Sequence, residues 1–378
     1  MKQSAVLDFI RLINTEGVGP VWFYKYIQKY GSAANALHEL SSTKNLFSQK
    51  EAEQELENAS KQNIQIITFE DDLYPSLLKE LNDAPPVLYA KGNLNLLKYP
   101  ASLAVVGSRH ASVSGRKIAS RMAYDLTNAD VLIVSGMARG IDSAAHKGAL
   151  YAKNEQGPTI AVLGTGVDVC YPQENQTLYE QIAEQGLLLS EFKLGEQANI
   201  SNFPRRNRLV AGLSLGVLVV EASLNSGSLI TARLALEQGK DIFAVPASPF
   251  ENKAAGCNKL IKEGALLTES ADDILQTLAL TQNQTLKTFQ NANLEPKPLD
   301  FEKKEVIMQK TKSIDADNIT VLQTIGVSGI EQDELIRHLN MQTNVALVKI
   351  TELEFEGLLT KQNGSFLTLT KEGLEKLK

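Results

Sequence analysis

The segment Leu103-Ala104-Val105-Val106-Gly107, followed by Ser108 and Arg109, decides the fold class. It is a short apolar run without polar alternation, and it ends in a glycine just before a helical pattern that begins near Val113. A strand of this kind has both faces covered, as in parallel sheets with helices on either side. The segment therefore predicts a buried strand that runs into a helix.

The same pattern recurs along the middle of the chain. Apolar runs that alternate with helical segments are Leu103–Gly107, Val131–Ser135, Thr159–Leu163, Leu187–Glu191, Val217–Glu221, Asp241–Val245 and Ala265–Thr268. Repeated units of strand and helix are typical of α/β proteins. We therefore expect an extended Rossmann-like, doubly wound, mostly parallel sheet.

Helical patterns precede this region. An apolar stripe from Leu7 to Ile13 is broken by Gly17-Val18-Gly19-Pro20, and a second helix is expected over Val21–Tyr30. The pattern is that of a helix-hairpin-helix (SAM-like) motif, whose loop amides can meet a phosphate backbone. A plain turn between two helices is the alternative.

A linker and a third domain follow the sheet. Residues 282–316 are rich in Gln, Asn, Lys and Pro, and 317–378 contain three helical patterns before a hairpin at Asn363-Gly364, as in a winged helix. Its candidate recognition helix carries three glutamates, so protein contact is the alternative to DNA contact. The expected domains are 1–75 (helical), 76–281 (Rossmann-like), 282–316 (linker) and 317–378 (winged helix).

Composition restricts the class of protein. The 378 residues include 38 Lys and Arg against 44 Asp and Glu, a formal charge of −6, so general coating of nucleic acid is disfavoured but a local basic groove is not. No apolar run is long enough to span a bilayer, and the first residues do not form a secretory signal. Only Cys170 and Cys257 are present, which disfavours disulfides and zinc. We expect a cytoplasmic protein without a metal.

Small and basic residues follow five consecutive predicted strands, where ligands bind in doubly wound sheets. Glycine lets a backbone approach a ligand closely, helix N-termini attract anions, and arginine matches phosphate oxygens. These loops therefore predict a phosphate site. They are 107–112, 135–142, 164–168, 203–208 and 221–231.

Common nucleotide sites fit these loops poorly. Neither G-x-G-x-x-G nor G-x-x-x-x-G-K-[ST] is present, so a dinucleotide or triphosphate cofactor is disfavoured and no cofactor is expected. His110 and His146 could act as bases but have no nucleophile beside them, and a structural role is expected. Asp142 is expected to cap a helix, and Glu221 to order the loops. We expect no catalytic residue.

A polymer of phosphates is the remaining candidate. A concave site at strand ends suits a single strand better than a duplex, which usually requires a helix that enters a groove. Four aromatic residues lie near the site in sequence, Tyr171, Phe192, Phe203 and Phe250, and only Phe203 is favoured as a stacking platform.

Together these loops resemble the DNA-processing protein A (DprA/Smf) family. The resemblance rests on Val105–Arg109, Ser135–Asp142, Ala161–Asp168 with Tyr171-Pro172, Phe203–Arg208, Ser226–Ala232 and Gly256–Ala265. Departures are Lys193 and Ala247, where proline and glycine are usual. Motifs and resemblance give these candidate DNA-binding residues: Gly107, Ser108, Arg109, Ser112, Gly136, Arg139, Gly140, Gly164, Gly166, Phe203, Arg205, Arg206, Asn207, Arg208, Ser226, Gly227, Ser228, Thr231 and Lys259.

The resemblance implies a single-stranded DNA-binding protein of natural transformation. It implies protection of incoming strands, loading of RecA recombinase onto DNA covered by single-strand-binding protein, and a homodimer formed through the Rossmann-like domain. It does not imply an enzyme. The alternatives are a Rossmann-like phosphoribohydrolase, whose glutamate is missing from Asn225–Arg233, and an adaptor, which leaves the arginines unexplained.

Overall fold

A computed structural model describes residues 3–152, 159–253, 255–281, 316–325, 330–339, 346, 349–350, 353–354, 357–362 and 366–370. The chain divides into two compact units, Met1–Asn293 and Leu294–Lys378, and each is described by itself. In the described part of the chain, no helix combines the length and the apolar character needed to cross a membrane.

The first unit begins with helices α1 (Gln3–Asn14), α2 (Pro20–Tyr30), α3 (Ala33–Leu40) and α4 (Gln49–Lys61). Pro20 occupies the first turn of α2, where its missing N–H costs no helical hydrogen bond. Ser48 and Glu51 form a reciprocal capping box at the start of α4. The rings of Phe9 and Phe23 pack in the core between α1 and α2, with centroids 5.0 Å apart.

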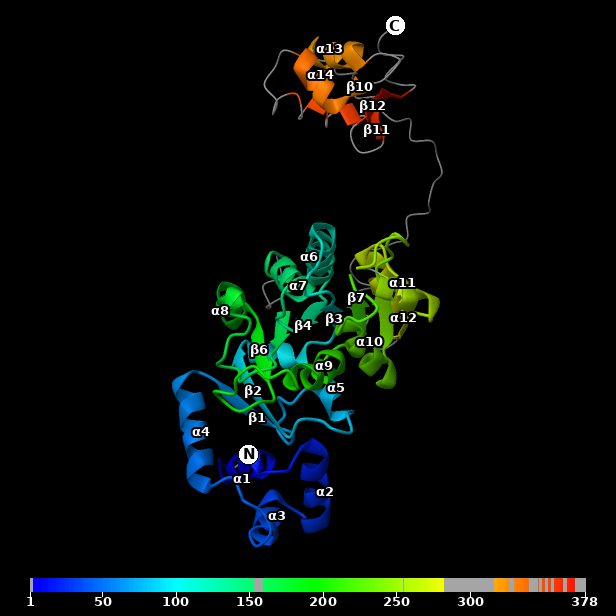
Figure 1. Cartoon of the computed structure of the whole chain (residues 1–378). Helices are drawn as coiled ribbons and strands as arrows, with labels where there is room; N and C mark the ends of the chain where they lie inside the picture. The colour runs from blue at the N-terminus through cyan, green and yellow to red at the C-terminus, as the bar shows by residue number, and fades with distance from the viewer. Residues whose placement is uncertain are drawn as a thin grey trace. The chain divides into compact units, whose positions relative to one another are not determined.

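A nine-stranded sheet forms the body of this unit (Figure 1). In chain order its strands are β1 (Gln65–Thr68), β2 (Val87–Gly92), β3 (Ser102–Val106), β4 (Leu132–Ser135), β5 (Thr159–Val162), β6 (Leu187–Ser190), β7 (Gly216–Val219), β8 (Asp241–Ala244) and β9 (Leu266–Leu267). Their spatial order is β1-β2-β6-β5-β4-β3-β7-β8-β9. The pairs from β6 to β9 are parallel, which confirms the predicted sheet. Strands β1 and β2 add an antiparallel edge that the sequence did not predict.

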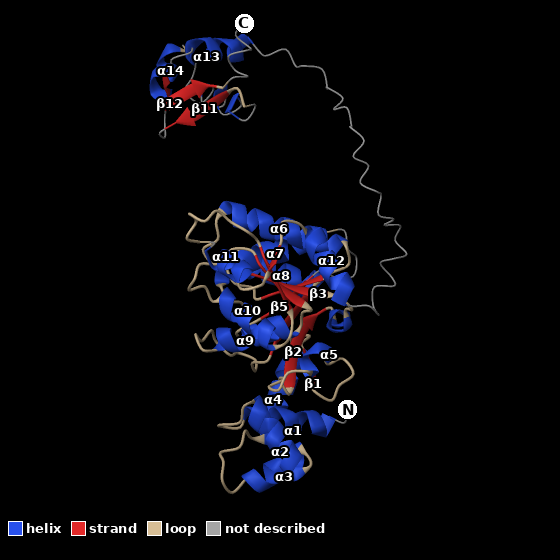
Figure 2. Ribbon diagram, turned by 90° about the vertical axis from the view of Figure 1, so that its right-hand side faces the viewer, coloured by secondary structure: helices blue, strands red, loops and turns tan. Residues whose placement is uncertain are grey.

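Helices cover both faces of the sheet (Figure 2). One face packs against α5 (Ser76–Lys79), α9 (Asn202–Gly212), α10 (Ser228–Glu237) and α11 (Ala255–Lys262). The other packs against α6 (Val113–Asn128), α7 (Ile141–Leu150), α8 (Gln176–Gln185) and α12 (Ala271–Thr281). Two short 3-10 helices, η1 (Leu94–Lys98) and η2 (Gln173–Asn175), complete the connections. The strands β3 to β7 are buried throughout, as their apolar sequences predict.

The strand order reverses beside β3. The chain runs outward from β3 through β4, β5 and β6, and then returns to place β7 on the other side of β3. Ala104 of β3 therefore pairs with Val134 of β4 on one side and with Val217 of β7 on the other. The loops after β3 and β7 lead to opposite faces, and ligand crevices form at such reversals.

The second unit contains α13 (Ala316–Ile325), β10 (Ile330–Glu331), α14 (Gln332–His338), β11 (Leu359–Gln362) and β12 (Phe366–Leu369). The strands pair antiparallel in the order β10-β12-β11. Leu322, Leu335 and Leu367 are buried in its core. Helices followed by a hairpin are the predicted winged-helix order; most of the predicted helix 344–356 and the Asn363-Gly364 turn lie outside the described residues.

Candidate functional site

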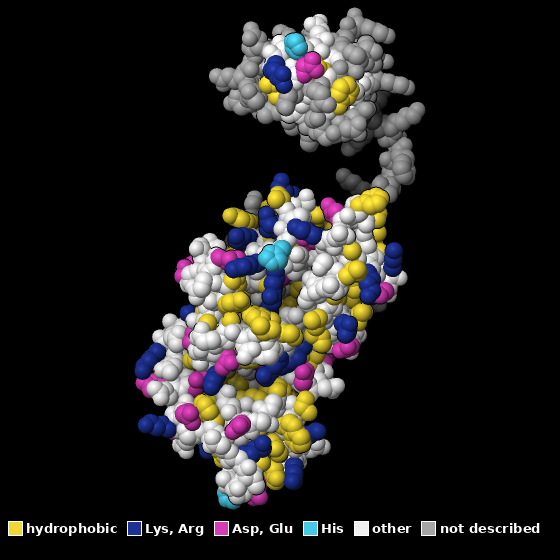
Figure 3. Space-filling view, viewed as in Figure 1, with side chains coloured by type: hydrophobic (Ala, Val, Ile, Leu, Met, Phe, Trp, Pro, Cys, Tyr) yellow, Lys and Arg dark blue, Asp and Glu magenta, His cyan; other side chains and the backbone are white. Residues whose placement is uncertain are grey.

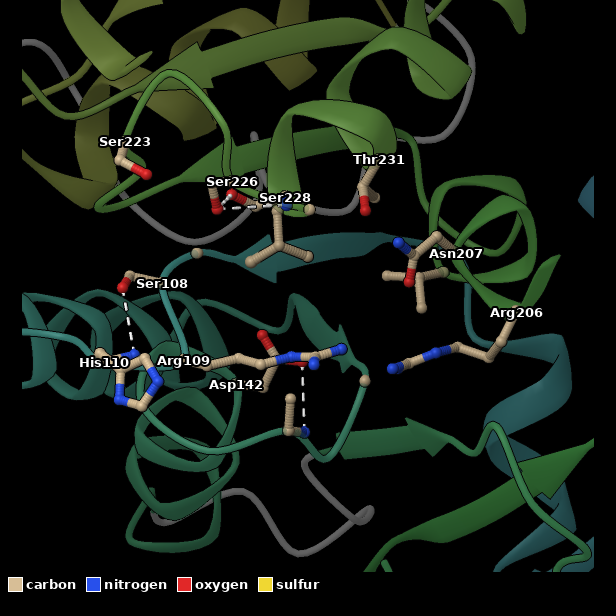
Figure 4. Close-up of a pocket in the computed structure, with 16 residues that line it drawn as sticks. Ser108, Arg109, His110, Asp142, Arg206, Asn207, Ser223, Ser226, Ser228 and Thr231 are labelled. Atoms are coloured by element: carbon tan, nitrogen blue, oxygen red, sulfur yellow. Dashed lines mark hydrogen bonds between the residues drawn. The ribbon is translucent and has the colours of Figure 1, made fainter. Parts of the chain in front are cut away.

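A cavity of about 340 Å³ opens where β3, β4 and β7 end, at the reversal of strand order. We call it the strand-end cavity. Figure 4 shows Arg109 and Arg206 entering it from opposite sides and pointing toward one another. It is lined by Val106, Gly107, Ser108, Arg109, His110, Gly136, Ala138, Asp142, Arg206, Asn207, Val210, Ser223, Ser226, Gly227, Ser228 and Thr231.

The two arginines of this cavity differ in environment. Arg206 of α9 is buried, its Nη1 donates to the backbone oxygen of Val162 at 2.9 Å, and burial lowers its pKa to about 10 against the opposing effect of Asp142. Asp142 is also buried, which raises its pKa, while Arg206 acts in the opposite direction. Arg109 is exposed and forms no ion pair within the described residues. Asp142 thus offsets the charge of both arginines, and Arg109 is the one whose exposed side chain can meet an anion.

Gly136, just after β4, makes room for Arg206. A Cβ atom added to Gly136 would lie 1.6 Å from Arg206 Nη1 and 2.4 Å from its Cζ. No side chain can occupy this position while the guanidinium stays in place. Gly136 is therefore needed to make room for the buried Arg206 guanidinium, apart from any close approach of a ligand.

Hydroxyl groups at the start of α10 line the wall of the strand-end cavity that lies opposite Asp142. Ser226 Oγ and Ser228 Oγ lie 2.7 Å apart, and Thr231 lies one turn further along the helix. The N-terminal end of a helix carries a partial positive charge, so this wall attracts an anion. Figure 4 shows these three side chains on one side of the cavity and Asp142 on the other.

A second cavity of about 180 Å³ adjoins the first and shares Arg109, His110, Gly136, Ala138 and Arg206 with it. We call it the aromatic cavity, because the rings of Phe203 and Tyr171 form part of its wall with centroids 5.4 Å apart. Its other lining residues are Arg139, Gly164, Thr165 and Pro172.

Phe203 is held between a glycine and an arginine. The Cζ atom of Arg109 lies 5.3 Å from the centroid of the Phe203 ring, within the range of cation–π attraction. A Cβ on Gly164 would lie 2.8 Å from Phe203 Cδ1, so the ring needs this glycine as well. The sequence favoured Phe203 alone among four aromatics, and the structure adds Tyr171 beside it.

Glu221, which is buried after β7, orders the loops around the cavity as predicted. Its carboxylate accepts hydrogen bonds from the backbone N–H of Ser112 at 3.1 Å and from the Ser112 hydroxyl at 2.5 Å. Its backbone oxygen accepts from Ser108 N at 2.6 Å. Ser112 in turn caps α6 by accepting from Gly115 N at 2.9 Å. Ser112 therefore positions the Arg109 loop without lining either cavity.

Several predicted residues lie outside both cavities. Arg208 is buried against Glu191 at 2.5 Å and Asp83 at 3.1 Å, and Arg205 lies 3.4 Å from the same Glu191. Arg139 lines the aromatic cavity, where it pairs with Glu174 at 2.7 Å. The predicted residues that line neither cavity are Ser112, Gly140, Gly166, Arg205, Arg208 and Lys259. Their roles in DNA binding stay predictions.

The two histidines near the site differ. His146 is buried, its Nδ1 lies 2.7 Å from Thr159 Oγ1, and burial lowers its pKa to about 3, so it is a neutral structural group. His110, for which a structural role was expected, is exposed and lines both cavities. Ser223 also lines the strand-end cavity, and only its place in the loop after β7 could have indicated this.

Two family models match the chain. The model for DNA recombination-mediator protein A matches residues 65–279, and that for a DprA-like N-terminal HHH domain matches 3–58. The DNA processing protein DprA of Streptococcus pneumoniae is 50% identical over 205 residues, which are 54% of this chain and 71% of that protein. Protein Smf of Escherichia coli is 42% identical over 233 residues, 61% of either chain.

Solved structures agree with these matches. The X-ray structure of the pneumococcal DprA superposes with a TM-score of 0.57 at 43% identity, covering 65% of this chain and 82% of that one. A structure of DNA processing protein A from Helicobacter pylori, whose subject is its single-stranded DNA binding mode, superposes with a TM-score of 0.52 at 32% identity. It covers 57% of this chain and 97% of that one.

Proposed function

This chain belongs to the DNA recombination-mediator protein A family, and from that membership and the site geometry we propose that it binds single-stranded DNA. A backbone phosphate occupies the strand-end cavity and an adjacent base enters the aromatic cavity. The observation that carries this proposal is the position of Arg109, which lines both cavities and lies 5.3 Å from the Phe203 ring.

Each cavity has the chemistry of one part of a nucleotide. Arg109, the Ser226 and Ser228 hydroxyls and the start of α10 offer positive charge and hydrogen-bond donors to a phosphate. Phe203 and Tyr171 offer aromatic surface to a base, and every base has a face that can stack. Contacts of both kinds tolerate any sequence.

The arrangement favours a single strand over a duplex. A base in a duplex has both faces covered by its neighbours, so it would have to leave the stack to enter a cavity of about 180 Å³. An unpaired base meets no such cost. The structure of the H. pylori relative concerns single-stranded DNA, which supports the same choice.

We further propose that binding serves recombination and that no bond is broken at this site. The strand held here would be protected and passed to RecA recombinase, with single-strand-binding protein and a second copy of this chain as further partners, in the cytoplasm. Support comes from the family match and from His110, whose backbone N–H, and not its imidazole ring, makes the hydrogen bond to the Ser108 hydroxyl. We also propose the expected domain boundaries 1–75, 76–281, 282–316 and 317–378. Strand β1 lies within 1–75 and pairs with β2, which lies within 76–281.

The test is an anisotropy titration of labelled oligothymidine and of a duplex of the same length, over a series of salt concentrations. Arg109→Ala is expected to weaken single-strand binding about tenfold, and to reduce the salt slope by about 0.7 for each phosphate that the variant no longer neutralises. Arg233→Ala is the matched control, because Arg233 is exposed on α10 outside both cavities. Unchanged affinity in Arg109→Ala would refute the site, and release of free base from nucleoside monophosphates would favour a phosphoribohydrolase.

A further inference from the structure

A third cavity lies on the outer surface of α6 and α7, and nothing in the proposed function uses it. This groove has a volume of about 610 Å³. It is lined by Val113, Arg116, Lys117, Ser120, Arg121, Tyr124, Ser143, Ala144, Lys147, Gly148 and Tyr151. We call it the α6–α7 groove, and Figure 3 shows Lys and Arg side chains gathered over these two helices.

Positive charge dominates the groove although the chain is acidic overall. Arg121 pairs with Asp125 at 2.7 Å, whereas Arg116, Lys117 and Lys147 have no ion pair in the part of the chain that the structure describes. The other acidic residue of the two helices is Asp142, which is buried at the strand-end cavity. Exposed cations without counterparts in a concave surface attract a polyanion.

The rest of the groove consists of small and aromatic side chains. Tyr151 is 79% exposed and Val113 is 63% exposed, while Arg121 lies 5.9 Å from the centroid of the Tyr124 ring. Cations beside one exposed ring, Tyr151, and one half-buried ring, Tyr124, are typical of surfaces that bind single strands by backbone charge and base stacking.

The α6–α7 groove and the strand-end cavity share no lining residue, but the start of α6 links them. Helix α6 begins directly after the loop that carries Arg109, and Arg116 Nη1 donates to the backbone oxygen of Ala111 in that loop at 2.6 Å. The loop that carries Arg109 is therefore tied to the first turn of α6, where the groove begins.

We propose that the α6–α7 groove binds the continuation of the DNA strand held in the strand-end cavity. This inference rests on the proposed function. An acidic peptide is the other occupant that the charge would admit, but the link between α6 and the Arg109 loop and the presence of two tyrosines favour the strand. The groove adds binding surface that only an oligonucleotide longer than the strand-end site can reach.

The experiment compares the double variant Lys117→Ala/Lys147→Ala with Lys50→Ala/Lys262→Ala, which removes two exposed lysines elsewhere. Affinities are measured by anisotropy for oligothymidines of about 8 and about 30 nucleotides. The groove variant is expected to bind the longer oligonucleotide about fivefold or more weakly and the shorter one within about twofold of the parent. The control is expected to match the parent for both.

The outcomes separate this inference from the proposed function. Equal affinity of both variants for the long oligonucleotide would show that the groove does not bind the strand, even if Arg109→Ala still weakens binding. If the groove variant instead loses binding of a labelled acidic peptide containing glutamate and phenylalanine, while it keeps the long oligonucleotide, the occupant is a protein and the inference is wrong. Failure of the parent to bind either oligonucleotide would refute the proposed function itself.

Discussion

Replacement of Gly136 by alanine tests how the strand-end cavity is built. The added Cβ would lie 1.6 Å from Arg206 Nη1, so the buried guanidinium must leave its place. Arg206 would lose its 2.9 Å hydrogen bond to the backbone oxygen of Val162, and buried Asp142 would lose the stronger of the two cations, Arg206 and Arg109, that lower its pKa. Removal of one partner from a buried charged pair costs about 3–5 kcal/mol, and we expect the free energy of unfolding to fall by about that amount.

The assay is urea unfolding followed by circular dichroism, with oligothymidine anisotropy on the folded variant. Gly227→Ala is the control, because Gly227 has right-handed backbone angles and no heavy atom within 4 Å of an added Cβ. Its unfolding free energy should change by less than about 1 kcal/mol. If Gly136→Ala unfolds at the same urea concentration as the parent, Arg206 does not occupy the space beside Gly136.

Buried groups of the same unit give three further expected outcomes. Arg206→Met is expected to lower the free energy of unfolding by about 3–5 kcal/mol, and Arg206→Met/Asp142→Asn to recover most of that loss, as measured by urea titration; equal losses would show that the pair is uncoupled. Burial lowers the pKa of His146 to about 3, so its contribution to stability is complete above about pH 6.5 and falls by about 1.4 kcal/mol per pH unit below it. His146→Gln should flatten this acid limb in urea titrations at several pH values, and an unaltered limb would contradict the assignment. Glu221→Ala should weaken oligothymidine binding severalfold by freeing the Ser112 loop, while Glu221→Gln retains most of the affinity because its amide oxygen can still accept a hydrogen bond.

The apolar runs alone were sufficient to predict the parallel sheet. Strands such as Leu132–Ser135 are buried on both faces, so they can be recognised from their own sequence without knowledge of the neighbouring strands. The antiparallel edge was missed for a physical reason. Gln65–Thr68 begins with a polar residue, is partly exposed and directly follows the helical region, so it lacks the continuous apolar composition of a buried strand.

The arginines show what sequence could not supply. Arg206 and Arg208 stand two residues apart on α9 and look equivalent in the motif, yet one lines the strand-end cavity and the other pairs with Glu191 and Asp83. Those carboxylates come from distant parts of the chain, so only the fold decides which guanidinium is left for a ligand.

The insertion of β7 beside β3 has a consequence for how the protein is made. Arg109 is synthesised early, but the wall that faces it consists of Ser226, Ser228 and Thr231, more than a hundred residues later. In a nascent chain that has completed only β3 to β6, the wall that faces the Arg109 guanidinium has not yet been made. Such a chain lacks one wall of the strand-end cavity, and so does any fragment that stops before the loop that leads into α10.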